Sequence, residues 1–256
     1  MLRIHFLQHW FELSDPGVEE ALYDSRAMRQ FVGIDLGKEP APDETTVCKF
    51  RHLMERHNLG GELFQLVNVY LEENGLKLNR GTIVDATIID APRSTKNTSD
   101  KRDPEMTSTQ KGNQWYFGMK AHIGVDSQTK LIHSVVVTAA NTHDSQVPGG
   151  LLHGNERRVY GGSAYTGQKM QIKERAKEAK DFTHKRGRRN HPLTEKERKA
   201  NRNKSKTRLR VEHIFGVIKH QFGYRKARYK GLAKNAQAVF IKCALANLVL
   251  AKRHLI

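Results

Sequence analysis

Residues 82–90 read TIVDATIID, a short run in which β-branched side chains surround one aspartate. Such a run, preceded by Gly81 and followed by a polar segment, predicts a buried β-strand. Asp85 lies in its centre, where a carboxylate is costly unless it is paired, hydrogen-bonded or bound to a metal. We therefore expect Asp85 to be either a satisfied structural aspartate or a metal ligand. Asp90 has the opposite facing and is the weaker candidate.

The residues after this strand alternate between strand and helix patterns. A polar loop is expected over 91–113. Strands are expected at WYFGMKAHIGVD (115–126), LIHSVVVTAA (131–140) and RRVY (157–160), with a further short strand near Phe182. Helices are expected at 167–178, 206–222 and 232–254. This order predicts an α/β domain over 82–256, with a mixed sheet flanked by helices.

The residues before the strand carry only helical patterns. Leu63, Leu66, Val67, Tyr70 and Leu71 form one apolar stripe at helical spacing, and Gly75 ends it. Residues 1–76 are therefore predicted to form a small all-helical domain, either a DNA-reading helix-turn-helix or a packing domain. Because the pattern at 1–11 begins without a capping residue, we expect this domain to be incomplete.

Positive charge is concentrated in the C-terminal part. The net charge is +17; residues 1–150 hold 16 basic and 20 acidic side chains, against 28 and 7 in 151–256. An anionic polymer is the natural partner of such a surface, with a solvated polar surface as the alternative. A basic insertion is expected around 183–210, and its candidate DNA-binding residues are Arg186, Arg188, Arg189, Lys204, Lys206 and Arg210.

A second acidic candidate lies on the helix expected at 206–222. Helical geometry places Arg208, Glu212 and Lys219 along one border of its apolar face, as either a metal and phosphate site or a surface ion-pair ladder. Mg²⁺ and Mn²⁺ take such oxygen ligands. The histidines match no zinc spacing. No signal peptide or membrane-spanning stretch is evident, which favours the cytoplasm.

Together these motifs resemble the DDE-type transposases of bacterial insertion sequences over essentially the whole chain. The resemblance is carried by IVDATII (83–89), KGNQWYFGMKAHIGVD (111–126), NTHDS (141–145) and RLRVEHIFGVIK (208–219). It implies an RNase H-like catalytic domain, with Asp85 and Glu212 as catalytic metal ligands for Mg²⁺ or Mn²⁺. It also implies phosphate contacts by Arg208 and Lys219.

The resemblance implies further partners and places as well. Double-stranded DNA, both element ends and target, would be the substrate, bound by a homo-oligomer in the bacterial cytoplasm near the nucleoid. Residues 1–76 would help to recognise the element ends.

The chain departs from this family at two positions. The second catalytic aspartate is expected in a segment reading G-D-x-A-Y, but the chain has Gly161-Gly162-Ser163-Ala164-Tyr165, so Gly162 stands in the aspartate's place. Neither Asp144 nor Asp181 is a convincing substitute. Ser205 replaces a common tyrosine. We expect a transposase with weak or absent cleavage. The alternatives are a DNA-binding protein without catalysis and a general nuclease.

Overall fold

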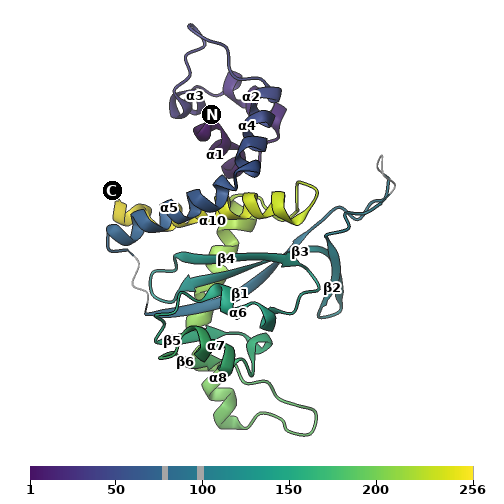
Figure 1. Ribbon diagram of the computed structural model, residues 1–256, viewed down its shortest axis with the longest axis vertical. Helices are drawn as coiled ribbons and strands as arrows, with labels where there is room; N and C mark the ends of the chain where they lie inside the picture. The colour runs from purple at the N-terminus through teal and green to yellow at the C-terminus, as the bar shows by residue number, and fades with distance from the viewer. Residues whose placement is uncertain (77–79, 97–100, 256) are drawn as a thin grey trace.

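A mixed sheet forms the centre of the computed structural model, which describes residues 1–76, 80–96 and 101–255 (Figure 1). Its main path has the order β4-β3-β1-β5-β6, and β2 pairs with the first part of β3. The strands are β1 (Gly81–Asp90), β2 (Thr107–Lys111), β3 (Gln114–Asp126), β4 (Ile132–Ala139), β5 (Arg158–Gly161) and β6 (Lys180–Thr183).

Strand direction identifies the architecture. β1 pairs antiparallel with β3 and parallel with β5, while β4 is antiparallel to β3 and β6 parallel to β5. Without β2, the five strands taken in chain order lie as 3-2-1-4-5. This is the order of the RNase H-like fold, so the expected mixed sheet is confirmed. β2 was not predicted, because TSTQK contains none of the apolar alternation that marks a half-buried strand.

The two faces of β1 are buried against different helices. Ile83 and Ile89 pack with α9 (Arg210–Gly216) and α10 (Leu232–Leu255) in the main core. Val84 points the other way and packs with α6 (Pro148–Leu151) and α7 (Lys169–Arg175). Since side chains alternate along a strand, Asp85 lies on the same face as Ile83 and Ile89, toward α9.

Helices make up the whole described part of residues 1–76 outside their connections, as the sequence predicts. They are α1 (Leu2–Phe11), α2 (Asp15–Asp24), α3 (Arg26–Val32), α4 (Glu44–Arg56) and α5 (Leu59–Glu73). Ser14, Ser25 and Asp43 cap three of them by accepting backbone N–H bonds. The first four form a group with its own small core, and α5 lies along α10 (Figure 1).

The residues expected to form one helix at 206–222 belong to three successive segments. α8 (Glu195–Arg208) begins at a capping box of Thr194 and Glu197, and α9 follows after Leu209. η3 (Val217–Gln221), a π-helical turn, comes directly after α9. α8 has no buried residue, whereas α9 buries Val211 and Ile214. The start of α8 was missed because its surface has no apolar stripe to reveal a helical period. Among the described residues, no helix is long and apolar enough to cross a membrane.

Candidate functional site

Asp85 lies in the middle of β1 with both carboxylate oxygens engaged. Oδ1 accepts the backbone N–H of Ala86 at 2.9 Å, and Oδ2 accepts from Nη2 of Arg208 at 2.9 Å. Burial raises the pKa of Asp85, and the nearby Arg208 guanidinium opposes this only in part. The carboxylate is therefore a buried anion whose nearest cation is an arginine.

Arg208 joins the two acids predicted from the sequence. It is the last residue of α8, and Glu212 follows in the first turn of α9. Nη2 of Arg208 lies 3.8 Å from Oε1 of Glu212, whose side chain is largely exposed. Nε of Arg208 is buried and has no hydrogen-bond partner. Leaving a buried donor unpaired is costly, so this atom marks a place where an acceptor is missing.

Gly162 lies beside Arg208, as Asp85 and Glu212 do. It follows directly on β5, whose Gly161 pairs with Val84 of β1, and its backbone is extended, at φ −69° and ψ −179°. A Cβ at Gly162 would lie 3.5 Å from Nε and 3.6 Å from Cζ of Arg208. Position 162 therefore faces the guanidinium that Asp85 and Glu212 share, and it does so without a carboxylate.

Lys219 does not join this cluster, although one regular helix would have placed it near Arg208 and Glu212. Its Nζ donates to the backbone O of Ile88 at 2.6 Å, further along β1. Burial lowers the pKa of Lys219, and the nearby Lys111 lowers it further. Asp90 and Glu212 act in the opposite direction and raise the pKa of Lys219.

Two side chains around the cluster were not singled out from the sequence. The hydroxyl of Tyr165 is buried without a hydrogen-bond partner, and burial raises its pKa, as do Asp144 and Asp85. Its place three residues after Gly162 was the available indication. Nε2 of His184 lies 3.3 Å from Oγ of Ser205, so this histidine connects the end of β6 with α8.

The two nearby aspartates have other partners. Asp144 forms an ion pair with Lys120 at 2.8 Å, and the side chain of His143, not Asp144, caps the short helical turn that follows. Asp181 accepts the backbone N–H of Thr183 at 2.7 Å.

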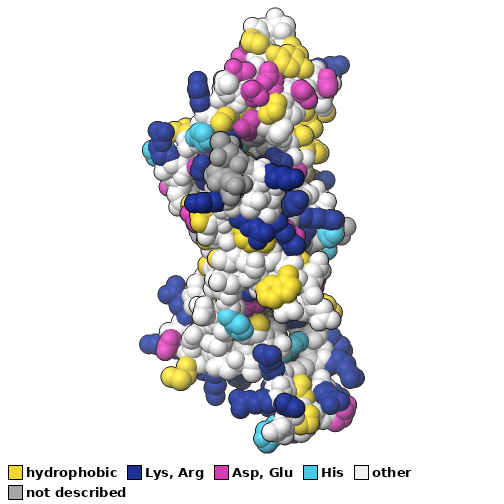
Figure 2. All heavy atoms as spheres, turned by 90° about the vertical axis from the view of Figure 1, so that its right-hand side faces the viewer, with side chains coloured by type: hydrophobic (Ala, Val, Ile, Leu, Met, Phe, Trp, Pro, Cys, Tyr) yellow, Lys and Arg dark blue, Asp and Glu magenta, His cyan; other side chains and the backbone are white. Residues whose placement is uncertain are grey.

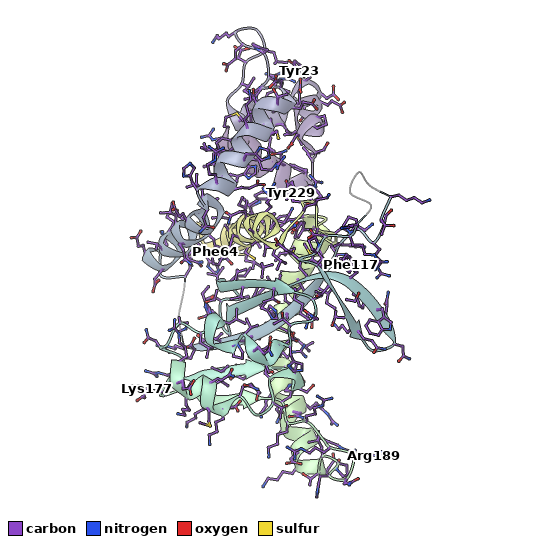
Figure 3. All side chains as sticks on the ribbon, turned by 45° about the vertical axis from the view of Figure 1, so that its right-hand side comes forward. Tyr23, Phe64, Phe117, Lys177, Arg189 and Tyr229 are labelled. Carbon is purple, nitrogen blue, oxygen red and sulfur yellow. The ribbon has the colours of Figure 1, made fainter. Side chains whose placement is uncertain are left out.

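The predicted DNA-binding residues of the basic segment divide into two groups. Lys204 and Arg210 each donate to a backbone carbonyl: Nζ of Lys204 donates to Thr183 O at 2.8 Å, and Arg210, although exposed, donates to the backbone O of Ser127. The second group, which is exposed, is Arg186, Arg188, Arg189 and Lys206. Figure 3 places Arg189 at the far end of the segment that leads into α8, away from the sheet.

Comparison with protein families identifies the chain. Residues 77–248 match the model described as Transposase DDE domain, which covers more than half of the sequence. The chain belongs to the DDE transposase family. Residues 1–53 match a second model, Transposase domain (DUF772), so helices α1 to α4 belong to a transposase as well. DDE transposases act on DNA in transposition and typically use Mg²⁺.

A two-metal site needs several carboxylate oxygens that converge on the cations. Here Asp85 and Glu212 face the guanidinium of Arg208, and position 162 offers no oxygen. Within the described residues, no group of three or more acidic, histidine or cysteine side chains is placed to hold a metal ion.

Proposed function

We propose that this chain is a DNA-binding protein of transposase descent in which strand cleavage is weak or absent. The observation that carries this proposal is the position of Arg208. Its guanidinium lies against Asp85 and within 3.8 Å of Glu212, and its unpaired Nε lies 3.5 Å from the Cβ position of Gly162. One positive charge of the protein itself thus occupies the centre of the three family positions.

Chemistry supports this reading. An aspartate at 162 would give the buried Nε an acceptor and draw the guanidinium away from Asp85. Without it, Arg208 pairs with Asp85, and a cation would have to displace a charge-assisted hydrogen bond at 2.9 Å. We expect Asp85 and Glu212 to be the remaining catalytic positions of an otherwise intact fold. Arg186, Arg188, Arg189 and Lys206 would hold DNA phosphates.

The test compares the natural chain with Gly162→Asp and Gly162→Asn. DNA carrying the element ends is incubated with Mg²⁺ or Mn²⁺, and strand cleavage and DNA binding are measured separately. We expect all three proteins to bind DNA and only Gly162→Asp to gain cleavage, by about a hundredfold or more, because one bridging ligand contributes several kcal/mol to the transition state. Asn fills the same volume without the charge. Strong cutting by the natural chain, unchanged in Gly162→Asp, would refute the proposal.

A further inference from the structure

Trp115 lies on a two-stranded extension of the sheet. β1 ends opposite Gly118, and residues 114–117 of β3 continue past it, paired with β2. This hairpin projects from the body of the molecule (Figure 1). Trp115 is 59% exposed, whereas Phe117, two residues along the same face, is 7% exposed in the core. The indole is therefore held on a regular strand and presented to solvent.

The register places Trp115 on the same face of the sheet as Asp85. Asp85 lies opposite Ile123, and opposed residues of a sheet share a face. Trp115 is eight residues before Ile123 on β3, an even step, so its side chain points the same way. At about 3.4 Å per residue, the two sites are separated by roughly 27 Å along the strand.

Arg93 and Lys111 lie next to Trp115 in the fold, and two acids of the loop before β2 are bound to other groups. Arg93 donates from Nη2 to the backbone O of Trp115 at 2.8 Å. Lys111 is on the paired strand, next to the turn. Asp103 and Glu105 instead accept the backbone N–H groups of residues 231 and 232. Figure 2, which looks onto the side where the hairpin projects, shows Lys and Arg side chains gathered in a band across the molecule.

We propose that Trp115 stacks on an unpaired base of bound DNA while Arg93 and Lys111 hold the adjacent phosphates. This rests on the DNA binding proposed above. The combination of an exposed aromatic and flanking cations fits a single strand, because every base has a face for stacking and every nucleotide a charge. A fully paired duplex hides its base faces, so the ligand is a DNA strand with unpaired bases.

The chain's two tryptophans make the test direct. Trp10 packs against Phe222, with the two ring centroids 5.6 Å apart, so Trp10→Phe leaves Trp115 as the single indole reporter. In this background we expect oligothymidylate of about 20 nucleotides to quench the fluorescence. In the otherwise natural chain, Trp115→Ala should weaken binding of this oligonucleotide about tenfold, and Trp115→Phe should weaken it less. Affinity for a fully paired duplex of equal length should stay within about twofold.

Tyr70→Ala is the matched control, since Tyr70 is an aromatic residue on α5 that is 49% exposed. The inference is overturned if Trp115 fluorescence does not respond, if Trp115→Ala and Tyr70→Ala behave alike, or if Trp115→Ala changes the sedimentation of the protein and not its affinity for DNA. If the protein binds duplex DNA but the oligonucleotide does not change Trp115 fluorescence, this inference is overturned and the proposed function is not. Failure to bind either DNA overturns the proposed function together with it.

Discussion

Gly161 and Gly162 adjoin in sequence but differ in the space around them. A Cβ at Gly161 would lie 3.1 Å from both the Tyr165 ring and Val84, whereas the three nearest atoms to one at Gly162 all belong to the Arg208 side chain, at 3.5 Å or more. We expect Gly161→Ala to lower the free energy of unfolding by about 1–2 kcal/mol through overpacking. Gly162→Ala should raise it by about 0.5 kcal/mol through the unfolded state. Urea denaturation measures both, and equal effects would contradict the proposed room for a side chain at 162.

Individual residues were predictable as far as the motifs reach. The pattern around Asp85, Gly162 and Glu212 singled out three positions that the structure places around one guanidinium. That Arg208 pairs with Asp85 across 123 residues of sequence could not be read from a helical stripe. It depends on where the end of α8 meets β1 in the folded chain.

At the scale of elements, the segment over 183–210 exposes positive charge and buries little. Its exposed arginines lie far from Lys173, Lys177 and Lys180, which are exposed on and after α7; Figure 3 labels Arg189 and Lys177. We expect changing Arg186, Arg188 and Arg189 together to Gln to weaken duplex binding and to lower the slope of log K against log salt by roughly three. The matched triple Gln variant of Lys173, Lys177 and Lys180 should bind as the natural chain does. Equal slopes in the two variants, measured by anisotropy, would contradict this assignment.

Helix α1 carries a buried histidine pair that makes its packing pH-dependent. Nε2 of His9 lies 3.3 Å from Nε2 of His5, and burial lowers the pKa of His5 to about 4. The unfolded chain then binds more protons than the folded one between pH 4 and 6.5, so stability falls as pH falls through this window. The loss from His5 should be on the order of 3 kcal/mol. His5→Phe should reduce the pH dependence of thermal unfolding, and the exposed His52→Gln should not. The reverse result would place the effect elsewhere.

Elements were predictable where burial imposes a period. β1, β3 and β4 were expected close to their observed bounds, because each buries side chains against the core. β2 and the first part of α8 bury almost nothing, so the sequence has no reason to alternate there. Both extend from the core into solvent: β2 carries Lys111, and the first part of α8 follows the exposed Arg186, Arg188 and Arg189.

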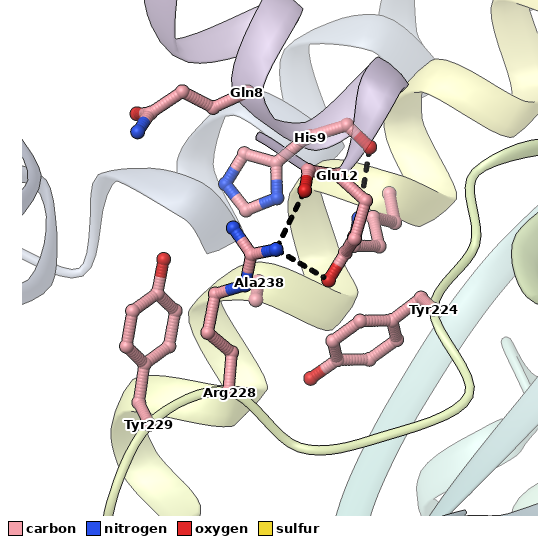
Figure 4. Close-up of a pocket in the computed structure, with 8 residues that line it drawn as sticks. Gln8, His9, Glu12, Tyr224, Arg228, Tyr229 and Ala238 are labelled. Carbon is pink, nitrogen blue, oxygen red and sulfur yellow. Dashed lines mark hydrogen bonds and ion pairs between the residues drawn. The ribbon is translucent and has the colours of Figure 1, made fainter. Parts of the chain in front are cut away.

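At the scale of the whole molecule, a buried ionic cluster connects the N-terminal helices with the C-terminal helix α10 (Figure 4). Lys242 of α10 is 1% exposed, and its Nζ donates to the His9 backbone O at 2.8 Å and to the carboxylate of Glu12. Arg228 also pairs with Glu12, at 3.4 Å. Burial lowers the pKa of Lys242 to about 8. Glu12 is therefore the one carboxylate that compensates two cations at this junction among the described residues.

This arrangement predicts that the two sides of the ion pair respond differently to substitution. Glu12→Gln leaves Lys242 buried without its counter-charge, so we expect a loss of about 3 kcal/mol in the free energy of unfolding. Lys242→Met removes the buried charge and keeps the volume while Arg228 still pairs with Glu12, so its effect should stay within about 1 kcal/mol. Urea denaturation at pH 7 compares them. If Lys242→Met proved as harmful as Glu12→Gln, the junction would depend on the lysine's hydrogen bonds and not on the balance of charge.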